Sequence, residues 1–218
     1  MALTRRQVLL AAVELADRDG LASLSMRSLA RHVGVEAMSL YHHIANKEAL
    51  LDGMVDIVFS EIHLPRSDRD WADEMRRRSN SGREALTRHR WAIGLMDSRS
   101  APGPDTLRHH DAVLGCLRAG GFPVRLAAHA FAVLDAFLYG FMVQELSLPL
   151  PTGTDLAGLA DQILASMPAD SLPHLAELTR EVVLQPGYAF GDEFGFGLEL
   201  VLDGLARRLA EPAEPADA

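Results

Sequence analysis

Apolar residues recur every three and four positions along most of the chain, the spacing typical of amphipathic helices. In residues 4–19 one face carries Val8, Leu9, Ala12, Val13, Leu15 and Ala16. Thr4 and Gln7 are spaced as a capping box, and Gly20 suits the end of a helix. Alternating strand patterns are not found, so the sequence predicts an all-α protein.

Three further helices are predicted in the N-terminal part, over residues 26–32, 36–43 and 46–62. Ser25 can cap the first of them and Asn46 the last. Gly34 permits a sharp turn between the two short helices, which is the arrangement of a helix-turn-helix. In such a unit the second helix enters the DNA major groove. An ordinary helical hairpin would have the same spacing.

Pro65 marks a connector after the fourth helix, and we place a domain boundary there, between residues 1–63 and 64–218. Beyond it the pattern predicts helices over 71–95, 105–119, 124–146 and 192–209, with Pro123 at the first position of the longest. Pro149–Thr154 and the surroundings of Pro168 and Pro173 are predicted to be loops. The Pro- and Ala-rich end EPAEPADA is predicted to be disordered.

Composition narrows the class of protein. The 218 residues are 48% apolar and 23% charged, as in an ordinary globular protein. The longest apolar stretch, residues 131–143, contains Asp135 and is shorter than the roughly 20 residues of a membrane-spanning helix. We therefore expect no membrane partner and, without a signal-peptide pattern, a cytoplasmic location. The single cysteine, Cys116, excludes an internal disulfide and a thiolate zinc site.

The charge is distributed unevenly along the sequence. Residues 1–50 contain six basic and five acidic side chains, whereas the remainder contains 15 basic and 25 acidic ones. The asymmetry is compatible with a separate partner for the N-terminal segment, and equally with chance.

A family resemblance is carried by the stretches AVELADRDGL, LSMRSLARHVGV and, most specifically, LYHHIANKEALLD. Residues 4–63 resemble the DNA-binding domain of the TetR (tetracycline repressor) family of bacterial transcription regulators. WADEMR, LRAGGF and FGFGLELVLDGL resemble the C-terminal half of the tetracycline repressor's own branch. Together these matches span nearly the whole chain.

The resemblance implies particular contacts with double-stranded operator DNA. Arg27 matches a position that reads guanine, for which its guanidinium is suited, although a phosphate contact or a solvated charge is the alternative. Ala37, Met38 and Ser39 match the base-facing positions of the reading helix. The phosphate-binding positions fall on Tyr41 and Lys47, and the backbone-facing residues His42 and His43 complete the predicted interface.

The resemblance also implies a homodimer, held by a four-helix bundle from helices 124–146 and 192–209 of each subunit. A small-molecule inducer bound in the C-terminal half would release a repressor from its operator. An activator or a ligand-independent regulator would use the same reading head, meaning the DNA-binding domain of residues 1–63. A helical adaptor with a degenerate head would instead be indifferent to Arg27→Ala and Tyr41→Phe.

The family's drug-contacting positions fit this sequence poorly. His63 matches a drug-contacting histidine, with a solvent-exposed connector histidine as the alternative. The asparagine position falls on Arg78, the phenylalanine position on Gly82, the metal-binding histidine on Met96 or Asp97, and the second-shell glutamate on Gln144. A magnesium–tetracycline complex is therefore doubtful, and we expect a different small molecule, with no cofactor and no protein-bound metal.

The candidate pocket lining lies on two helices. His110, Val113, Leu114 and Leu117 share one of them, and Phe131, Asp135, Leu138 and Met142 share the other. Plain core packing is the alternative for each, since any helical bundle needs an apolar stripe. Asp135 differs, because a carboxylate among apolar residues must be solvated, paired or facing a cavity.

No constellation of a nucleophile, a base and an orienting group is visible, so we do not expect an enzyme. The densest titratable cluster, His109, His110 and Asp111, is interpreted as a solvated helix face.

Overall fold

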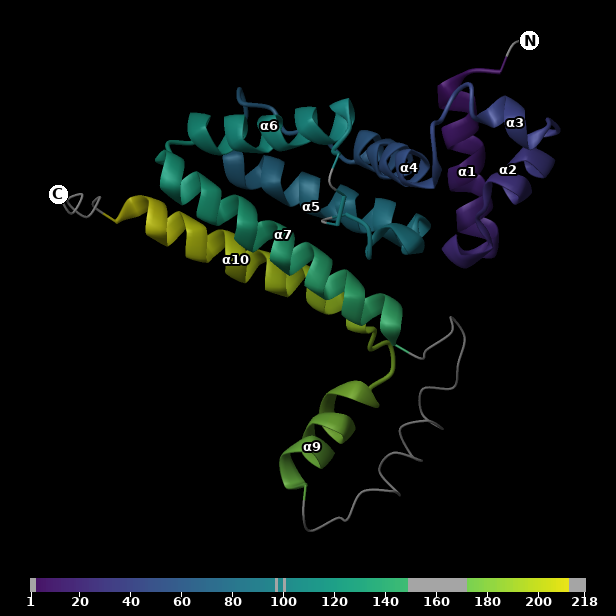
Figure 1. Cartoon of the computed structure of the whole chain (residues 1–218). Coiled ribbons are helices and arrows are strands. Elements are labelled where there is room, and N and C mark those ends of the chain that lie inside the picture. The colour runs from purple at the N-terminus through teal and green to yellow at the C-terminus, as the bar shows by residue number, and fades with distance from the viewer. Residues whose placement is uncertain (1–2, 97, 100, 149–171, 212–218) are drawn as a thin grey trace.

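The computed structural model describes residues 3–96, 98–99, 101–148 and 172–211. All regular elements in these ranges are helical, which confirms the all-α prediction (Figure 1). The longer helices are α1 (Arg5–Asp19), α2 (Met26–Val33), α4 (Lys47–Glu61), α5 (Trp71–Arg88), α6 (Pro104–Ala119), α7 (Val124–Ser147) and α10 (Glu193–Ala210). The shorter ones are α3 (Ala37–Leu40), α9 (Pro173–Leu178), η1 (Leu21–Ser23), η2 (Arg90–Ala92), η3 (Thr179–Val183) and η4 (Phe190–Asp192).

The predicted helix caps form as the sequence indicates. Thr4 accepts a hydrogen bond from the backbone N–H of Gln7, whose side chain in turn accepts from the Thr4 N–H. Asn46 Oδ1 accepts from the Ala49 N–H at 2.8 Å. Ser25 forms a capping box with Ser28. Because each cap satisfies backbone groups that a helix end leaves free, these three helices begin where their local sequence dictates.

Three predicted boundaries are wrong. Of the predicted helix 36–43 only α3 forms, because after Leu40 the chain turns, and the N–H groups of His43 and Ile44 both donate to the Leu40 carbonyl oxygen at 2.9 Å. The predicted helix 71–95 ends at Arg88, where His89 leaves helical geometry (φ −110°, ψ 57°) before η2 begins. Pro173, predicted in a loop, instead starts α9, a position where a missing N–H costs nothing.

One further boundary is displaced by one residue, and three other predictions fall wholly or mostly outside the described residues. Pro123 stands one position before α7 rather than at its first residue. The predicted loops at 149–154 and Pro168, and the predicted disordered end apart from Glu211, lie outside the described residues.

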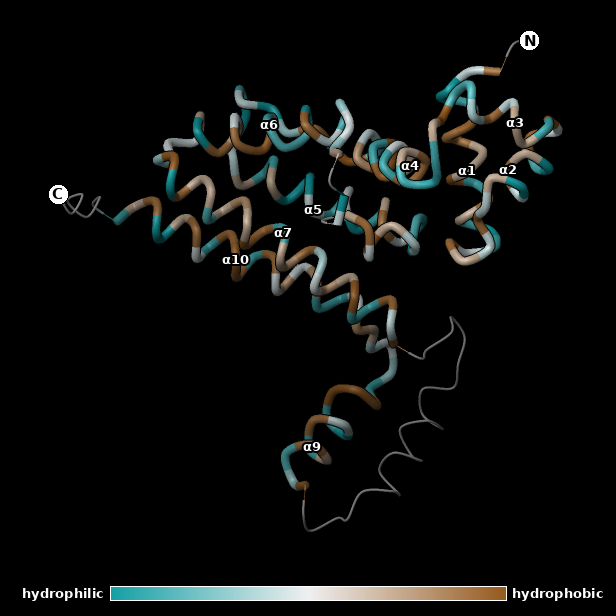
Figure 2. Tube along the Cα trace, viewed as in Figure 1, coloured by the Kyte–Doolittle hydropathy of each residue, from teal (hydrophilic) through white to brown (hydrophobic). Residues whose placement is uncertain are grey.

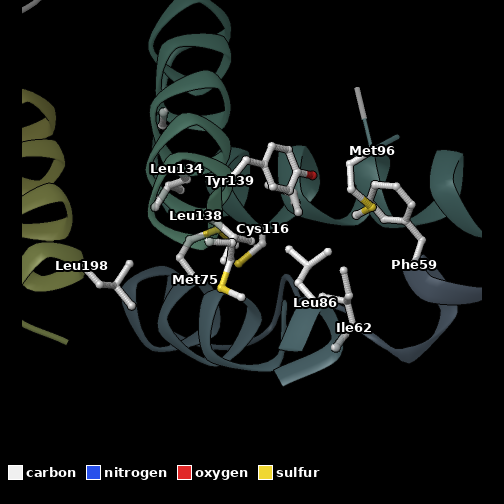
Figure 3. Close-up of a cluster of buried hydrophobic side chains, with 14 of the residues drawn as sticks. Phe59, Ile62, Met75, Leu86, Met96, Cys116, Leu134, Leu138, Tyr139 and Leu198 are labelled. Carbon is white, nitrogen blue, oxygen red and sulfur yellow. The ribbon is translucent and has the colours of Figure 1, made fainter. Parts of the chain in front are cut away.

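Two hydrophobic clusters organise the fold. The first gathers buried residues of α1–α4 from Val8 to Ile57, and the second gathers residues from Val55 to Leu205. Helix α4 contributes residues to both clusters, so a movement of α4 would change the packing of each. Figure 2 shows hydrophobic stretches along much of α7 and α10, which run side by side. Figure 3 shows the centre of the second cluster, where Met75, Cys116 and Leu138 meet.

Gly34, between α2 and α3, adopts a left-handed conformation (φ 79°, ψ 33°). A Cβ atom there would meet no atom within 4 Å, so Gly34→Ala should cost only backbone strain, about 1–2 kcal/mol of unfolding free energy. Urea denaturation measures this. Gly115→Ala in α6, also with open space, should raise stability by about 0.5–1 kcal/mol. Equal effects of the two substitutions would contradict the assignment of strain to Gly34.

Candidate nucleic-acid interface and interior polar site

The short helices α2 and α3 present the predicted base-reading residues at the surface. Arg27 lies exposed on α2, and Met38 is 71% exposed on α3. Ala37 and Ser39 are half-buried beside it, while fully buried Leu40 anchors α3 to the first cluster. The anchored helix therefore presents a small, mostly apolar tip, suited to contacts with thymine methyl groups.

The predicted phosphate-binding residues follow directly after α3. Tyr41 is 45% exposed, His42 is exposed and His43 half-buried, all in the turn rather than on a helix. Lys47 is exposed at the first position of α4. Within the described ranges, neither Arg27 nor Lys47 makes an ion pair, so both charges are free to meet a phosphate or a base edge.

A polar cluster joins the reading head to the rest of the protein. The ring of His89 lies between two carboxylates, with Nδ1 2.9 Å from Asp17 Oδ1 of α1 and Nε2 3.0 Å from Glu61 Oε2 of α4. Trp91 Nε1 donates to Asp17 Oδ1 at 2.7 Å, and Arg88 Nη2 donates to Glu61 Oε2 at 2.8 Å. The end of α5 and η2 thus fix α1 relative to α4.

Glu61 gives this junction a pH dependence. Burial disfavours its ionised form, but the bonds from Arg88 and His89 outweigh burial and hold the pKa of Glu61 below its usual value of 4.5. A carboxylate with a lowered folded pKa stabilises the protein above about pH 4.5, and that contribution is lost as the pH falls.

Glu61→Gln should therefore flatten the loss of stability between about pH 5 and pH 3, and cost about 1 kcal/mol at neutral pH, reduced by solvent because a third of the side chain is exposed. Thermal unfolding across this pH range measures both effects. Glu84→Gln, at an exposed glutamate of α5, is the matched control. An unchanged profile for Glu61→Gln would show that the junction bonds contribute nothing.

The predicted pocket-lining residues separate into three groups. Val113, Leu117, Leu138 and Met142 are fully buried in the second cluster. His110 and Phe131 are half-buried with ring centroids 5.2 Å apart. Leu114 is 38% exposed on the outer face of α6, so the structure does not place it with the others.

Asp135 is paired, which decides among the three possibilities that its surroundings left open. It is 8% exposed and accepts a hydrogen bond at 2.5 Å from Nη2 of Arg78, which is 1% exposed. The pair joins α5 to α7 within the second cluster.

His63 faces a buried carboxylate. Its Nε2 donates to Glu74 Oε2 at 2.7 Å, and the same oxygen accepts from the backbone N–H of Arg66 at 3.0 Å. Burial opposes the charge of Glu74, but these bonds outweigh it and hold the pKa of Glu74 below its usual value. His63 therefore has one ring nitrogen committed to the fold.

His109 corrects the interpretation of residues 109–111 as a solvated face. Asp111 is exposed, but His109 is 1% exposed and its ring packs 5.4 Å from that of Phe59. Burial, followed by the nearby charge of Arg78, lowers the pKa of His109 to about 3, so the imidazole is neutral at physiological pH.

A cavity of about 170 Å³ opens between α4, the segment after η2 and α6. Met96, Thr106 and His110 line it, together with the charged side chains of Asp52 and Arg99. Met96 supplies a thioether, which Mg²⁺ does not favour, and Gln144 is exposed on α7, so these positions do not fit a magnesium-bound ligand. Asp97 lies outside the described residues. Within the described ranges, no three His, Cys, Asp or Glu side chains converge as a metal site requires.

Two families match this chain. Residues 8–54 match the family described as "Bacterial regulatory proteins, tetR family", and residues 64–209 match "Tetracyclin repressor-like, C-terminal domain". The chain belongs to the TetR family. This confirms the resemblance found in the sequence. It also confirms the prediction that the protein is a DNA-binding transcriptional regulator.

Relatives of this TetR-family regulator are described as regulators rather than enzymes. An "HTH-type transcriptional regulator" of Saccharopolyspora erythraea is 37% identical over 66% of this chain, and the match spans only 61% of that relative. The "HTH-type transcriptional repressor DrrR1" of Streptomyces coeruleorubidus is 31% identical over 96% of this chain and 79% of its own. The structure of Streptomyces coelicolor ActR in complex with actinorhodin superposes with a TM-score of 0.80 at 29% identity, covering 97% of this chain and 100% of that one.

Three polar residues of the TetR-family regulator escaped sequence reasoning as members of a site. The sequence pattern indicates only a family position for Arg78, a solvated helix face for His109 and no role for His89. Each meets partners from other helices far along the sequence, such as Asp135, which lies 57 positions after Arg78. A charged or polar residue at a core position of an amphipathic helix is the sequence signal for such a residue. His109 has this signal, because it lies one turn before the buried Val113.

Proposed function

We propose that this regulator is a cytoplasmic homodimeric repressor that a small-molecule effector releases from its operator. Residues 1–63 would read the operator, and residues 64–218 would bind the effector and form the dimer. The observation that carries the proposal is a set of exposed apolar side chains on α7 and α10, which run side by side (Figure 1).

Four large apolar side chains on these two helices are about half exposed or more. Val133 is 47% exposed and Val143 51% on α7, and Phe196 is 68% exposed and Leu200 55% on α10. Contiguous exposed apolar surface marks an interaction site. A two-fold axis beside α7 and α10 would bury the same face of each copy in a four-helix bundle.

Helix α7 is also long and apolar enough to cross a membrane by length and composition alone, and 39% of its most apolar window is buried in the protomer. A second copy accounts for the remaining apolar surface without a membrane. Dimerisation also suits DNA reading, because two reading helices held about 34 Å apart contact successive turns of the major groove.

Leu200→Arg should convert the dimer to a folded monomer and weaken operator binding at least tenfold, because a charge on each copy would be buried at the two-fold axis. Sedimentation velocity measures the oligomeric state, and fluorescence anisotropy measures operator binding. Leu107→Arg, on α6 at an equal exposure of 55%, should leave both unchanged. A Leu200→Arg protein that stays dimeric would refute this interface.

The route from effector to operator would run through α4 and the His89 junction. Helix α4 contributes to both clusters, and His89 holds α1 against the end of α4.

Repression itself is tested by in vitro transcription from a promoter that overlaps the selected operator. Added protein should lower the transcript level, and a rise in transcript would identify an activator.

A further inference from the structure

The junction between the reading head and the rest of the protein contains a histidine that is held by two carboxylates. The ring of His89 is buried, with 7% of its side chain exposed. Its Nδ1 lies 2.9 Å from Oδ1 and 3.0 Å from Oδ2 of Asp17, on α1. Its Nε2 lies 3.0 Å from Oε2 of Glu61, at the end of α4. One ring therefore joins two helices of the reading head to the end of α5.

Both ring nitrogens must donate for these contacts to be hydrogen bonds. An ionised carboxylate only accepts, and a neutral imidazole carries one N–H, whereas an imidazolium carries two. Burial opposes the charge of Glu61, but the bonds from Arg88 and His89 hold its pKa below the usual value, so it is ionised at neutral pH. Oδ1 of Asp17 already accepts the indole N–H of Trp91 at 2.7 Å. The double contact therefore requires a proton on each nitrogen of the ring.

The charges around the ring lead to the same requirement. Asp17 brings a negative charge from α1 and Glu61 brings another from α4. Arg88 of α5 brings one positive charge, with Nη2 2.8 Å from Glu61 Oε2. Arg90, the charged residue of η2, donates from Nη2 to a backbone carbonyl of α7 at 3.0 Å. A neutral His89 would leave one partly buried negative charge unbalanced, which is costly.

His63 shows the contrast within the same protein. Its Nε2 contacts one carboxylate, that of Glu74, at 2.7 Å. A neutral imidazole has the single N–H that this contact needs. Loss of a ring proton therefore breaks a contact at His89 but is compatible with the contact at His63.

The double contact restricts the reading head. A neutral His89 can donate to only one of its two partners, so either α1 or α4 is released from the end of α5. A reading head that is held in one orientation loses less conformational freedom when it binds DNA. The protonated junction should therefore bind DNA more tightly than the neutral one. Histidine is the side chain that changes its charge within the physiological range of pH.

We propose that Asp17, His89 and Glu61 form a proton-dependent latch, and that operator binding weakens when His89 loses its proton as the pH rises. The proton acts at the junction rather than in the proposed effector site of the C-terminal half. The inference goes beyond the proposed function, because it requires specific DNA binding but neither a small-molecule effector nor a dimer.

Histidine side-chain NMR on the full-length protein, labelled with ¹⁵N-histidine, tests the protonation itself. The signals of His89 are assigned by their absence in His89→Gln. At about pH 6 both ring nitrogens of His89 should carry a proton, and by about pH 8 one of them should have lost it. A His89 ring with a single N–H at the lower pH would overturn the proposal, whatever the protein does with DNA.

Fluorescence anisotropy with the operator, at constant ionic strength, tests the effect on DNA binding. Between about pH 6 and pH 8 the unaltered protein should lose roughly fivefold more affinity than His89→Gln, because a hydrogen bond between charged groups is lost in it. His42 and His43 titrate in both proteins, so the difference reports His89. Equal losses of affinity in the two proteins would refute the latch.

Asp17→Asn separates the latch from a general effect of charge. The asparagine oxygen can accept from Trp91, and its NH₂ group can donate to the bare Nδ1 of a neutral His89, so this latch no longer needs the second ring proton. Asp17→Asn should therefore lose roughly fivefold less affinity over the same pH range than the unaltered protein.

Asp19→Asn is the matched control for Asp17→Asn. It makes the same change of charge two positions along α1, at a carboxylate that is 41% exposed and pairs with Arg18. It should keep the pH dependence of the unaltered protein. A pH dependence as steep in Asp17→Asn as in Asp19→Asn would contradict the proposal, and this comparison stands even if His89→Gln does not fold.

Discussion

Arg27→Ala should weaken binding of the protein to its operator by on the order of 100-fold or more. A bidentate contact between arginine and guanine is worth about 1–3 kcal/mol, and a two-fold dimer would lose two of them. Arg27 is exposed on α2 and makes no ion pair within the described part of the chain, so its guanidinium is available for that contact. Fluorescence anisotropy with the operator and with variants at the contacted base measures the effect.

The way in which DNA affinity falls across different sequences distinguishes a contact with a base from an electrostatic contact with the phosphate backbone. Arg27→Ala should also relax discrimination at one base pair of each half-site, whereas Tyr41→Phe should weaken binding nearly uniformly across sequences. Arg18→Ala is the control, because Arg18 lies near the end of α1 and is paired with Asp19. A loss in Arg27→Ala no greater than in Arg18→Ala would remove Arg27 from the interface.

Asp135→Leu should lower the free energy of unfolding by about 3–5 kcal/mol, because it leaves the guanidinium of Arg78 buried without a counter-charge. For a chain of this length the melting temperature should fall by roughly 10 °C. Differential scanning calorimetry measures the change. The same substitution with Arg78→Met should restore most of the loss, because no unpaired charge is then left in the core.

The control for this prediction is the second ion pair between the same helices. The Arg83–Glu145 side chains are 29% and 22% exposed, so water can solvate a lone charge there. Glu145→Leu should therefore lower the free energy of unfolding clearly less than Asp135→Leu does. Equal losses at the two sites would mean that burial does not determine the strength of the Arg78–Asp135 pair.

The parts of the fold that depend on neighbouring residues were predictable. The caps at Thr4, Ser25 and Asn46 and the turn at Gly34 are local signals, so the N-terminal helices begin where the sequence indicates. The end of α5, which the sequence pattern did not predict, depends on distant partners. His89 ends α5 because its ring contacts Asp17 and Glu61, which lie 72 and 28 positions away.

The candidate sites divide in the same way. The reading-head residues follow from motifs in one continuous stretch, and the structure places Arg27, Met38 and Tyr41 at the surface. Their contacts with DNA stay a prediction. The buried polar residues could not be predicted to lie together from the sequence. Arg78, His109 and Asp135 are on three different helices, and only the packing of those helices decides which polar side chains are buried.

The central claim is that this chain reads a specific DNA site as a two-fold dimer. The most direct test is to select fragments of the source genome with the purified protein at roughly physiological salt, and then to footprint the best fragment. We predict a protected site with two-fold symmetry and half-sites about one helical turn apart. Absence of any enriched fragment, or an asymmetric site occupied by a single subunit, would contradict the account.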